Sequence, residues 1–223
     1  MGTVTAQEVI DRVQLVLQDE AGIRWQDATE LLGWLNDGQR EVMVYKPNAN
    51  VVNGSTQLIA GTKQSLPADG IQLIDVPRNL GVNGNTPGRV IRIAMREVLD
   101  AQAPDWHTLP PSAVTKHYMY SPLDPKHFYV YPPATGTASV EIIYSATPAK
   151  LAQLANTISI DDIYANVLVD YILYRAYSKD SEYVANPARA SAHQGAYVGA
   201  LTGKTQSEVV VNPNTSAPAS PNA

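Results

Sequence analysis

The chain has 223 residues, 44% of them hydrophobic, which is enough for one domain or for one domain with an inserted subdomain. Its net charge of −5 excludes a strongly basic protein that holds nucleic acid through phosphate contacts, and its lack of cysteine excludes disulfides, thiolate metal sites and cysteine nucleophiles. No apolar run approaches the ~18 residues that span a bilayer, and residues 1–20 lack a basic region followed by an apolar one, so neither a membrane span nor a signal peptide is expected.

A capping-box pattern predicts that the first helix begins after Thr5. Glu8 follows Thr5 by three residues, so each side chain can bond to the backbone N–H of the other residue. Apolar residues then recur at helical spacing as far as Leu17, and Gly22 is the predicted end of this helix.

The second predicted helix repeats the pattern with Asp27 and Glu30, and it ends before Pro47. Its apolar stripe consists of Leu31, Leu35, Gly38, Val42 and Tyr45. A glycine costs about 1 kcal/mol relative to alanine in a helix, so Gly38 on the stripe indicates close approach of another helix. Residues 1–50 are therefore predicted to form an N-terminal helical hairpin that needs the rest of the fold to bury its stripe.

Residues 51–150 have the pattern of an inserted β-rich subdomain. Short β-rich runs alternate with turn signals every ~8–12 residues. The runs cover residues 71–76, 89–98, 128–131 and 140–144. Asn83-Gly84, Ser121-Pro122 and pairs of adjacent prolines lie between them and mark turns or strand edges. The pattern predicts a small antiparallel sheet or sandwich.

Residues 151–204 return to helical patterns that complete the bundle. One helix is predicted from about Asp161 to Lys179, and Asn186-Pro187 has the cap and first-turn pattern that opens another, ending near Gly203. The predicted fold class is therefore α+β. It comprises a helical bundle with two N-terminal and two C-terminal helices, an inserted antiparallel β subdomain and an extended C-terminal arm.

The predicted arm comprises residues 205–223, which have too little apolar content to fold alone. Its β-branched triplet, Val209, Val210 and Val211, can add as a strand to an exposed edge of a neighbouring subunit or partner protein. The alternative is a tail that folds back on its own domain.

The chain contains no convincing pattern for catalysis or for a cofactor. Gly203-Lys204-Thr205 resembles the end of a phosphate-binding loop, but Val198 stands where that loop needs a glycine. His117, Asp124 and His127 lie close in sequence and could form a metal site. The favoured interpretation is that the histidines lie on the surface of strands. Asp105-Trp106-His107 lacks a serine in a nucleophile elbow, and Trp106 is predicted to anchor a loop. We expect no catalytic, metal or cofactor site.

Tyrosine is overrepresented, with 12 residues against one phenylalanine. Tyr118, Tyr120, Tyr129 and Tyr131 alternate along two neighbouring predicted strands. Cross-strand packing is the favoured interpretation of these four residues, and an aromatic face that binds a base or sugar is the alternative.

Several ordered motifs resemble those of phage head-to-tail adaptor proteins, the family similar to the tail tubular proteins under the portal of short-tailed phages. The first is Trp25 with Asp27 and the run 30–41, which resembles part of the opening helix pair of those proteins. The others are residues 66–70, 99–100 with 104–107, 124–133 and 170–180. The similarity covers about residues 4–204, and the arm is covered poorly.

This resemblance implies a non-enzymatic structural protein of the virion, made in the host cytoplasm and placed at the head-to-tail junction. It implies a ring of twelve copies below the portal, through which genomic DNA passes without specific binding. No membrane is expected among the partners of the protein. The arm, with Val209, Val210, Val211, Asn212 and Pro213, would grip the portal protein, and the β subdomain would face a tail nozzle or tail tube protein. The candidate residues for contacts between subunits or with the tail are Tyr118, Tyr120, Tyr129 and Tyr131.

Two alternatives stay open at the level of sequence. A glycan-binding or hydrolytic tail component would use the aromatic strands, with His107 or His127 beside Asp105 or Asp124. An assembly scaffold unrelated to phages would show no affinity for a portal.

Overall fold

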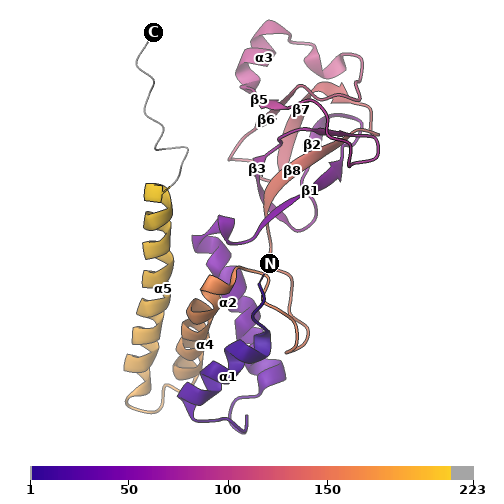
Figure 1. Cartoon of the computed structure of the whole chain (residues 1–223). Coiled ribbons are helices and arrows are strands. Elements are labelled where there is room, and N and C mark those ends of the chain that lie inside the picture. The colour runs from indigo at the N-terminus through magenta and orange to yellow at the C-terminus, as the bar shows by residue number, and fades with distance from the viewer. Residues whose placement is uncertain (1, 212–223) are drawn as a thin grey trace. The chain divides into compact units, whose positions relative to one another are not determined.

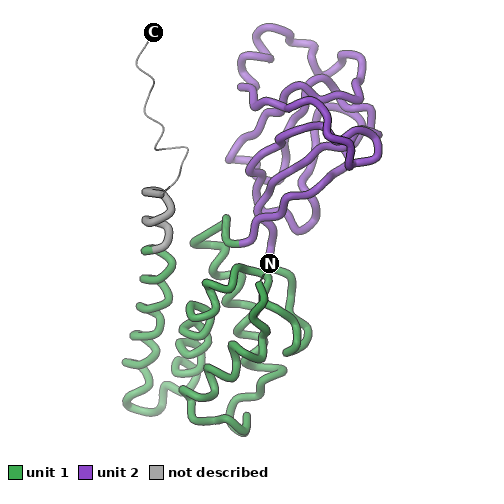
Figure 2. Tube along the Cα trace, viewed as in Figure 1, with its two compact units in different colours: residues 1–49, 148–223 green, residues 50–147 purple. Residues whose placement is uncertain are grey.

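The computed structural model describes residues 2–211, with side chains up to Gly203. The chain divides into two compact units (Figure 2). The helical unit combines Met1–Ala49 with Pro148–Ala223, and the β unit is Asn50–Thr147. The α+β class predicted from the sequence is confirmed.

In the helical unit, α4 (Ala165–Lys179) is the central helix, and α1 (Ala6–Leu17), α2 (Leu32–Tyr45) and α5 (Asn186–Val211) each pack against it (Figure 1). A π-helical turn, Asp27–Leu31, precedes α2, and short 3-10 turns lie at Pro47–Ala49 and Asp162–Tyr164. The fully buried side chains of this core include Ile10, Leu31, Leu35, Leu168 and Ile172.

The predicted capping box of α1 is confirmed, but the helix ends earlier than Gly22. Thr5 Oγ1 accepts from Glu8 N at 3.2 Å, and Glu8 Oε2 accepts from Thr5 N at 2.8 Å. Gln18 stops the helix because it adopts the left-handed region, with φ 55°. The Asp19 carboxylate then accepts hydrogen bonds from the backbone amides of residues 23–25 and holds the connection to α2.

The start of the second helix differs from the capping prediction, whereas the packing role of Gly38 is confirmed. Asp27 lies inside the π-helical turn, and its Oδ1 accepts from Gln14 Nε2 at 2.5 Å instead of capping a helix. A Cβ added at Gly38 would lie 2.9 Å from Tyr171 Cδ1 and 3.2 Å from Leu168 Cδ2, so α2 and α4 approach closely there.

The last helix is longer than predicted, because α5 continues past Gly203 to Val211. A glycine costs only about 1 kcal/mol in a helix, and no proline occurs between Pro187 and Pro213 to end it. The backbone at Val209, Val210 and Val211 is therefore helical, where an extended strand was expected. The other predicted arm residues, Asn212 and Pro213, lie outside the described residues.

The β unit contains two four-stranded sheets whose side chains share one core. In the first sheet, β8 (Ser139–Ala146) lies between β1 (Val51–Gln57) and β3 (Gly70–Asp75), and it also pairs with β4 (Asn79–Gly81). The second has the order β2 (Gly61–Ser65), β7 (His127–Ala134), β6 (His117–Tyr120), β5 (Arg92–Ile93). All pairs are antiparallel except β5–β6. Buried residues from both sheets, such as Leu73, Phe128, Val130, Val140 and Ile142, form the shared core.

The predicted strand over residues 89–98 is wrong for most of its length. Only Arg92–Ile93 form a strand, and α3 (Arg96–Gln102) follows almost at once. The alternation that suggested a half-buried strand does not correspond to burial, because Ile93 and Met95 are 67% and 73% exposed.

Candidate functional site

The strand register separates the four candidate tyrosines into two pairs on opposite faces of the sheet. Tyr118 pairs with Val130 and Tyr120 with Phe128, whereas Tyr129 pairs with Met119 and Tyr131 with His117. Directly paired residues of an antiparallel ladder lie on the same face, so Tyr118 and Tyr120 lie opposite to Tyr129 and Tyr131. The four residues therefore do not form one aromatic binding face.

The first pair lies on the core side of the sheet. Tyr118 is 5% exposed and its hydroxyl donates to Asp75 Oδ1 at 2.9 Å. Burial, together with the neighbouring Asp75 carboxylate, raises the pKa of Tyr118 well above its usual value. Tyr120 is half-buried against the same core. These contacts confirm cross-strand and core packing for this pair.

The second pair packs under the segment that contains α3 and the 3-10 turn Trp106–Thr108. The ring centroid of Trp106 lies 6.2 Å from that of Tyr129 and 6.4 Å from that of Tyr131. Trp106 is fully buried and its Nε1 donates to Asp100 Oδ1 at 2.8 Å. The Arg96 guanidinium lies 5.0 Å from the centre of the Tyr129 ring. Trp106 is thus the loop anchor that the sequence predicted.

The histidines considered for metal binding or hydrolysis lie in separate polar contacts. His127 Nδ1 lies 2.7 Å from Asp124 Oδ1. His107 Nδ1 lies 2.8 Å from Thr62 Oγ1, and its ring stacks on Trp106. His117 Nδ1 is buried without a hydrogen-bond partner. Among the described side chains, which end at Gly203, no three His, Cys, Asp or Glu residues gather in a way that can hold a metal ion.

A pocket of about 570 Å³ lies in the β unit beside β5, α3 and the turn between β6 and β7. Ile93 and Met95 form an exposed apolar rim, and Met119 lies buried within it. Tyr120 and Tyr129 also line it, so the pocket brings together one member of each tyrosine pair. Arg96, Glu97, Asp124 and His127 add charged and polar groups to the same lining. Apolar and aromatic groups beside polar ones are typical of a protein-contact surface.

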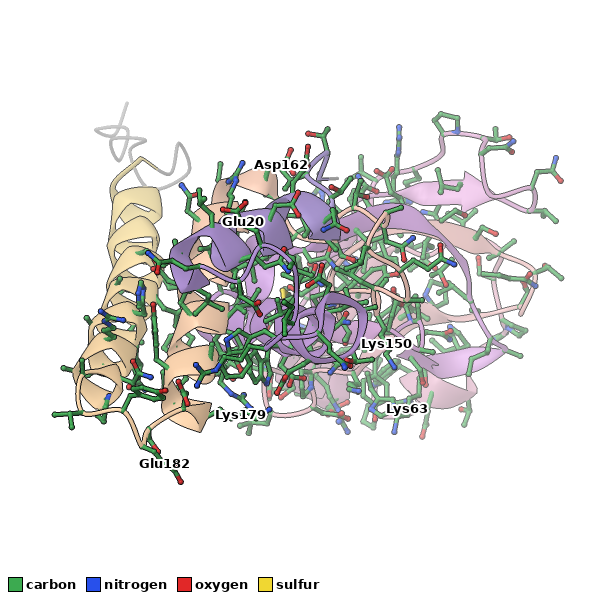
Figure 3. All side chains as sticks on the ribbon, turned by 90° about the horizontal axis from the view of Figure 1, so that it is seen from below. Glu20, Lys63, Lys150, Asp162, Lys179 and Glu182 are labelled. Atoms are coloured by element: carbon green, nitrogen blue, oxygen red, sulfur yellow. The ribbon has the colours of Figure 1, made fainter. Side chains whose placement is uncertain are left out.

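Charge is divided unequally between the two units. The β unit has seven basic and seven acidic side chains, whereas the helical unit has nine basic and fourteen acidic ones, so the whole net charge of −5 lies on the helical unit. Glu182, on the connection between α4 and α5, points away from the bundle (Figure 3). The helical unit therefore repels polyanions more strongly than the β unit does.

Helix α5 is attached to α4 and α2 by aromatic contacts. The ring centroid of Tyr197 lies 5.3 Å from that of Tyr171 and 6.1 Å from that of Tyr45. The Tyr197 hydroxyl is buried without a hydrogen-bond partner, and burial raises the pKa of Tyr197 above its usual value. His193 Nδ1 adds a contact of 2.9 Å to Asp170 Oδ1. These contacts fix α5 along the bundle by its aromatic side, and the other side of the helix is exposed as far as Gly203.

No helix in the described part of the chain has both the length and the apolar content to cross a membrane. A family model described as SU10 adaptor protein matches residues 4–219. The match includes both units and extends beyond the residues that carry the motif resemblance. No curated protein matches the chain.

Proposed function

The chain belongs to the SU10 adaptor protein family, and we propose that it forms a ring that joins the phage portal to the tail and lets DNA pass. The single observation that carries this proposal is the family match over residues 4–219. A role as a phage head-to-tail adaptor follows from the family, and the ring, its partners and the passage of DNA are the proposed details.

The proposed ring contains twelve copies, one for each portal subunit, at the head-to-tail junction of the virion. Such a ring is closed by heterologous contacts, in which one surface of each copy meets a different surface of the next. The large negative charge of the helical unit supports a channel that DNA passes through without binding, because acidic side chains repel the DNA phosphates.

Residues 205–223 are proposed to grip the portal, with Val209, Val210, Val211, Asn212 and Pro213 as candidate contacts. The β unit is proposed to meet the tail nozzle or tail tube protein. Its pocket beside β5 and α3 supports that role because Ile93 and Met95 expose apolar surface next to Tyr120 and Tyr129.

The glycan-binding or hydrolytic alternative is not favoured. The four tyrosines do not form one sugar platform, because Tyr118 and Tyr120 lie on the opposite face of the sheet to Tyr129 and Tyr131. Tyr120 and Tyr129 line the β-unit pocket, but Tyr118 is buried in the core and Tyr131 is not part of the lining. His127 contacts Asp124 and His107 contacts Thr62, so the two histidines do not share a carboxylate partner through these contacts.

The proposed grip on the portal is tested by co-sedimentation of the full-length chain with its cognate portal ring. A variant without residues 205–223 is the comparison, and circular dichroism checks that it stays folded. We expect the full chain to sediment with the portal and the shortened chain to stay in the supernatant. Equal co-sedimentation of both would refute the portal-binding arm, and no co-sedimentation of either would refute the adaptor role at the portal.

A further inference from the structure

Strand β1 forms an open edge of the first sheet of the β unit. In the sheet order it stands next to β8 and has no neighbour on its other side (Figure 1). Its ladder with β8 is regular from Val51, which pairs with Ser145, to Gln57, which pairs with Ser139. Seven consecutive residues therefore form one unbroken edge.

The backbone direction at the two ends of β1 shows which groups the edge offers. Ala146 N donates to Asn50 O at 2.9 Å, and Leu58 N donates to Ala138 O at 2.9 Å. The backbone N–H and C=O groups of the even-numbered residues therefore point toward β8. Backbone groups alternate in an antiparallel ladder. The odd-numbered residues consequently turn their N–H and C=O groups outward, where no strand of the described chain lies. These residues are Val51, Asn53, Ser55 and Gln57.

Soluble proteins protect open strand edges with charges, prolines, bulges or short strands. The other edge strands of the β unit follow this rule: β5 has two residues, β4 has three, and the pairing of β3 and β2 is interrupted by register shifts. β2 also carries Lys63. β1 has no charge, no proline and no register shift. An edge of this kind is suited to pairing with another chain.

We propose that β1 is the edge through which the β unit pairs with a second copy of this chain by main-chain hydrogen bonds. This inference rests on the proposed ring, which requires contacts between identical copies. The charge distribution is compatible with a second copy as the occupant, because the β unit has equal numbers of acidic and basic side chains and does not repel itself. Pairing of β1 with β1 would have two-fold symmetry and close at two copies, so a ring pairs β1 with a different edge.

Amide hydrogen exchange of the full-length chain tests this pairing directly. The chain is measured unassembled at low concentration and then assembled, either alone or on the portal ring. We expect the outward amides of β1 to exchange at least about tenfold more slowly in the assembly, whereas the inward amides are protected in both states.

The outcomes separate this inference from the proposed function. A ring in which the outward amides still exchange rapidly contradicts the β1 contact and leaves the adaptor ring intact. A two-copy species with protected outward amides supports the β1 contact and contradicts the ring. A chain that stays monomeric at every concentration and on the portal contradicts both.

A matched pair of variants gives a second, independent test. Asn53→Pro removes one outward N–H, and proline is tolerated on an edge strand whose N–H faces solvent. Asn53→Ala removes the same side chain but keeps the N–H. We expect Asn53→Ala to assemble like the wild type and Asn53→Pro to need at least about tenfold more protein to assemble, a shift worth about 1.4 kcal/mol. Equal assembly of the two variants would overturn the proposal, and if Asn53→Pro fails to fold, the exchange pattern of the wild type decides.

Discussion

Gly38 of α2 lies directly against Tyr171 of α4, and a Cβ at position 38 would come within 2.9 Å of Tyr171 Cδ1. Contacts this short force neighbouring atoms to move, and Leu168 lies nearly as close on the same helix. Gly33 lies in the same helix as Gly38, but a Cβ added there would meet no atom within 4 Å. The two glycines therefore differ in packing although both lie in α2.

Substitution of Gly38 by leucine is expected to destabilise the helical unit, whereas substitution of Gly33 by alanine is not. Gly38→Leu should lower the free energy of unfolding by about 1–3 kcal/mol because the α2–α4 contact becomes overpacked. Gly33→Ala should raise it by up to about 1 kcal/mol, because alanine favours the helix. Urea unfolding measures both. If Gly38→Leu leaves the free energy of unfolding unchanged, the close approach of α2 and α4 is absent in solution.

The buried amide of Asn36 links α2 to a distant segment of the helical unit. Its Nδ2 donates to Leu32 O and Leu151 O at 3.0 Å each, and its Oδ1 accepts from Leu151 N at 2.8 Å. Asn36→Ala leaves the buried backbone groups of Leu151 without these partners. We expect the free energy of unfolding to fall by about 1–3 kcal/mol. Asn166→Ala is the control, because it removes only an exposed hydrogen bond from Arg12 Nη1, and it should change the free energy of unfolding by less than Asn36→Ala does.

Acid is expected to release the N-terminal segment from Asp162. The Asp162 carboxylate accepts from Val4 N at 3.0 Å, from Thr3 N at 2.7 Å and from Thr3 Oγ1 at 2.7 Å. The hydrogen bond from the Val4 amide, followed by those from Thr3, lowers the pKa of Asp162 below its reference value of 3.8.

The sign of the pH effect follows from this lowered pKa. The stabilisation is fully present above the unfolded pKa and is lost as the pH falls through the lower folded pKa. Between about pH 4 and pH 2, the wild type should therefore lose more of its free energy of unfolding than Asp162→Asn, which cannot ionise. Identical pH profiles for the two proteins would contradict this role of Asp162.

The exposed apolar rim of the β-unit pocket is expected to contribute to tail binding and not to stability. Met95→Asp adds a charge to a side chain that is 73% exposed, beside Ile93. It should weaken binding to the cognate tail nozzle or tube protein at least about tenfold, because a charge in an apolar contact must be desolvated. Val82→Asp places the same charge on a comparably exposed residue outside the pocket lining and should bind normally. Equal affinity of the two variants would exclude the pocket as the contact.

Features with a local cause could be predicted from the sequence. The capping box of Thr5 and Glu8 was predictable because the bonding groups are three residues apart. The close approach at Gly38 was predictable because a glycine on an apolar helical stripe leaves room for a neighbouring helix, although the identity of its partner Tyr171 was not.

Features that depend on distant pairing could not be predicted. The opposite faces of Tyr118 and Tyr129 follow from the β6–β7 register, which the alternation of residues does not reveal. The link from Asn36 to Leu151 joins residues 115 positions apart, and only the folded helical unit brings them together. The open edge of β1 likewise appears only once the sheet order is known.

The mass of the complex between the portal ring and the full-length chain, measured by native mass spectrometry, tests the adaptor ring most directly. We predict a single dominant complex with one copy of the chain for each portal subunit. A portal ring that keeps its own mass in excess chain, or that binds a few copies without reaching one per subunit, would contradict the adaptor ring.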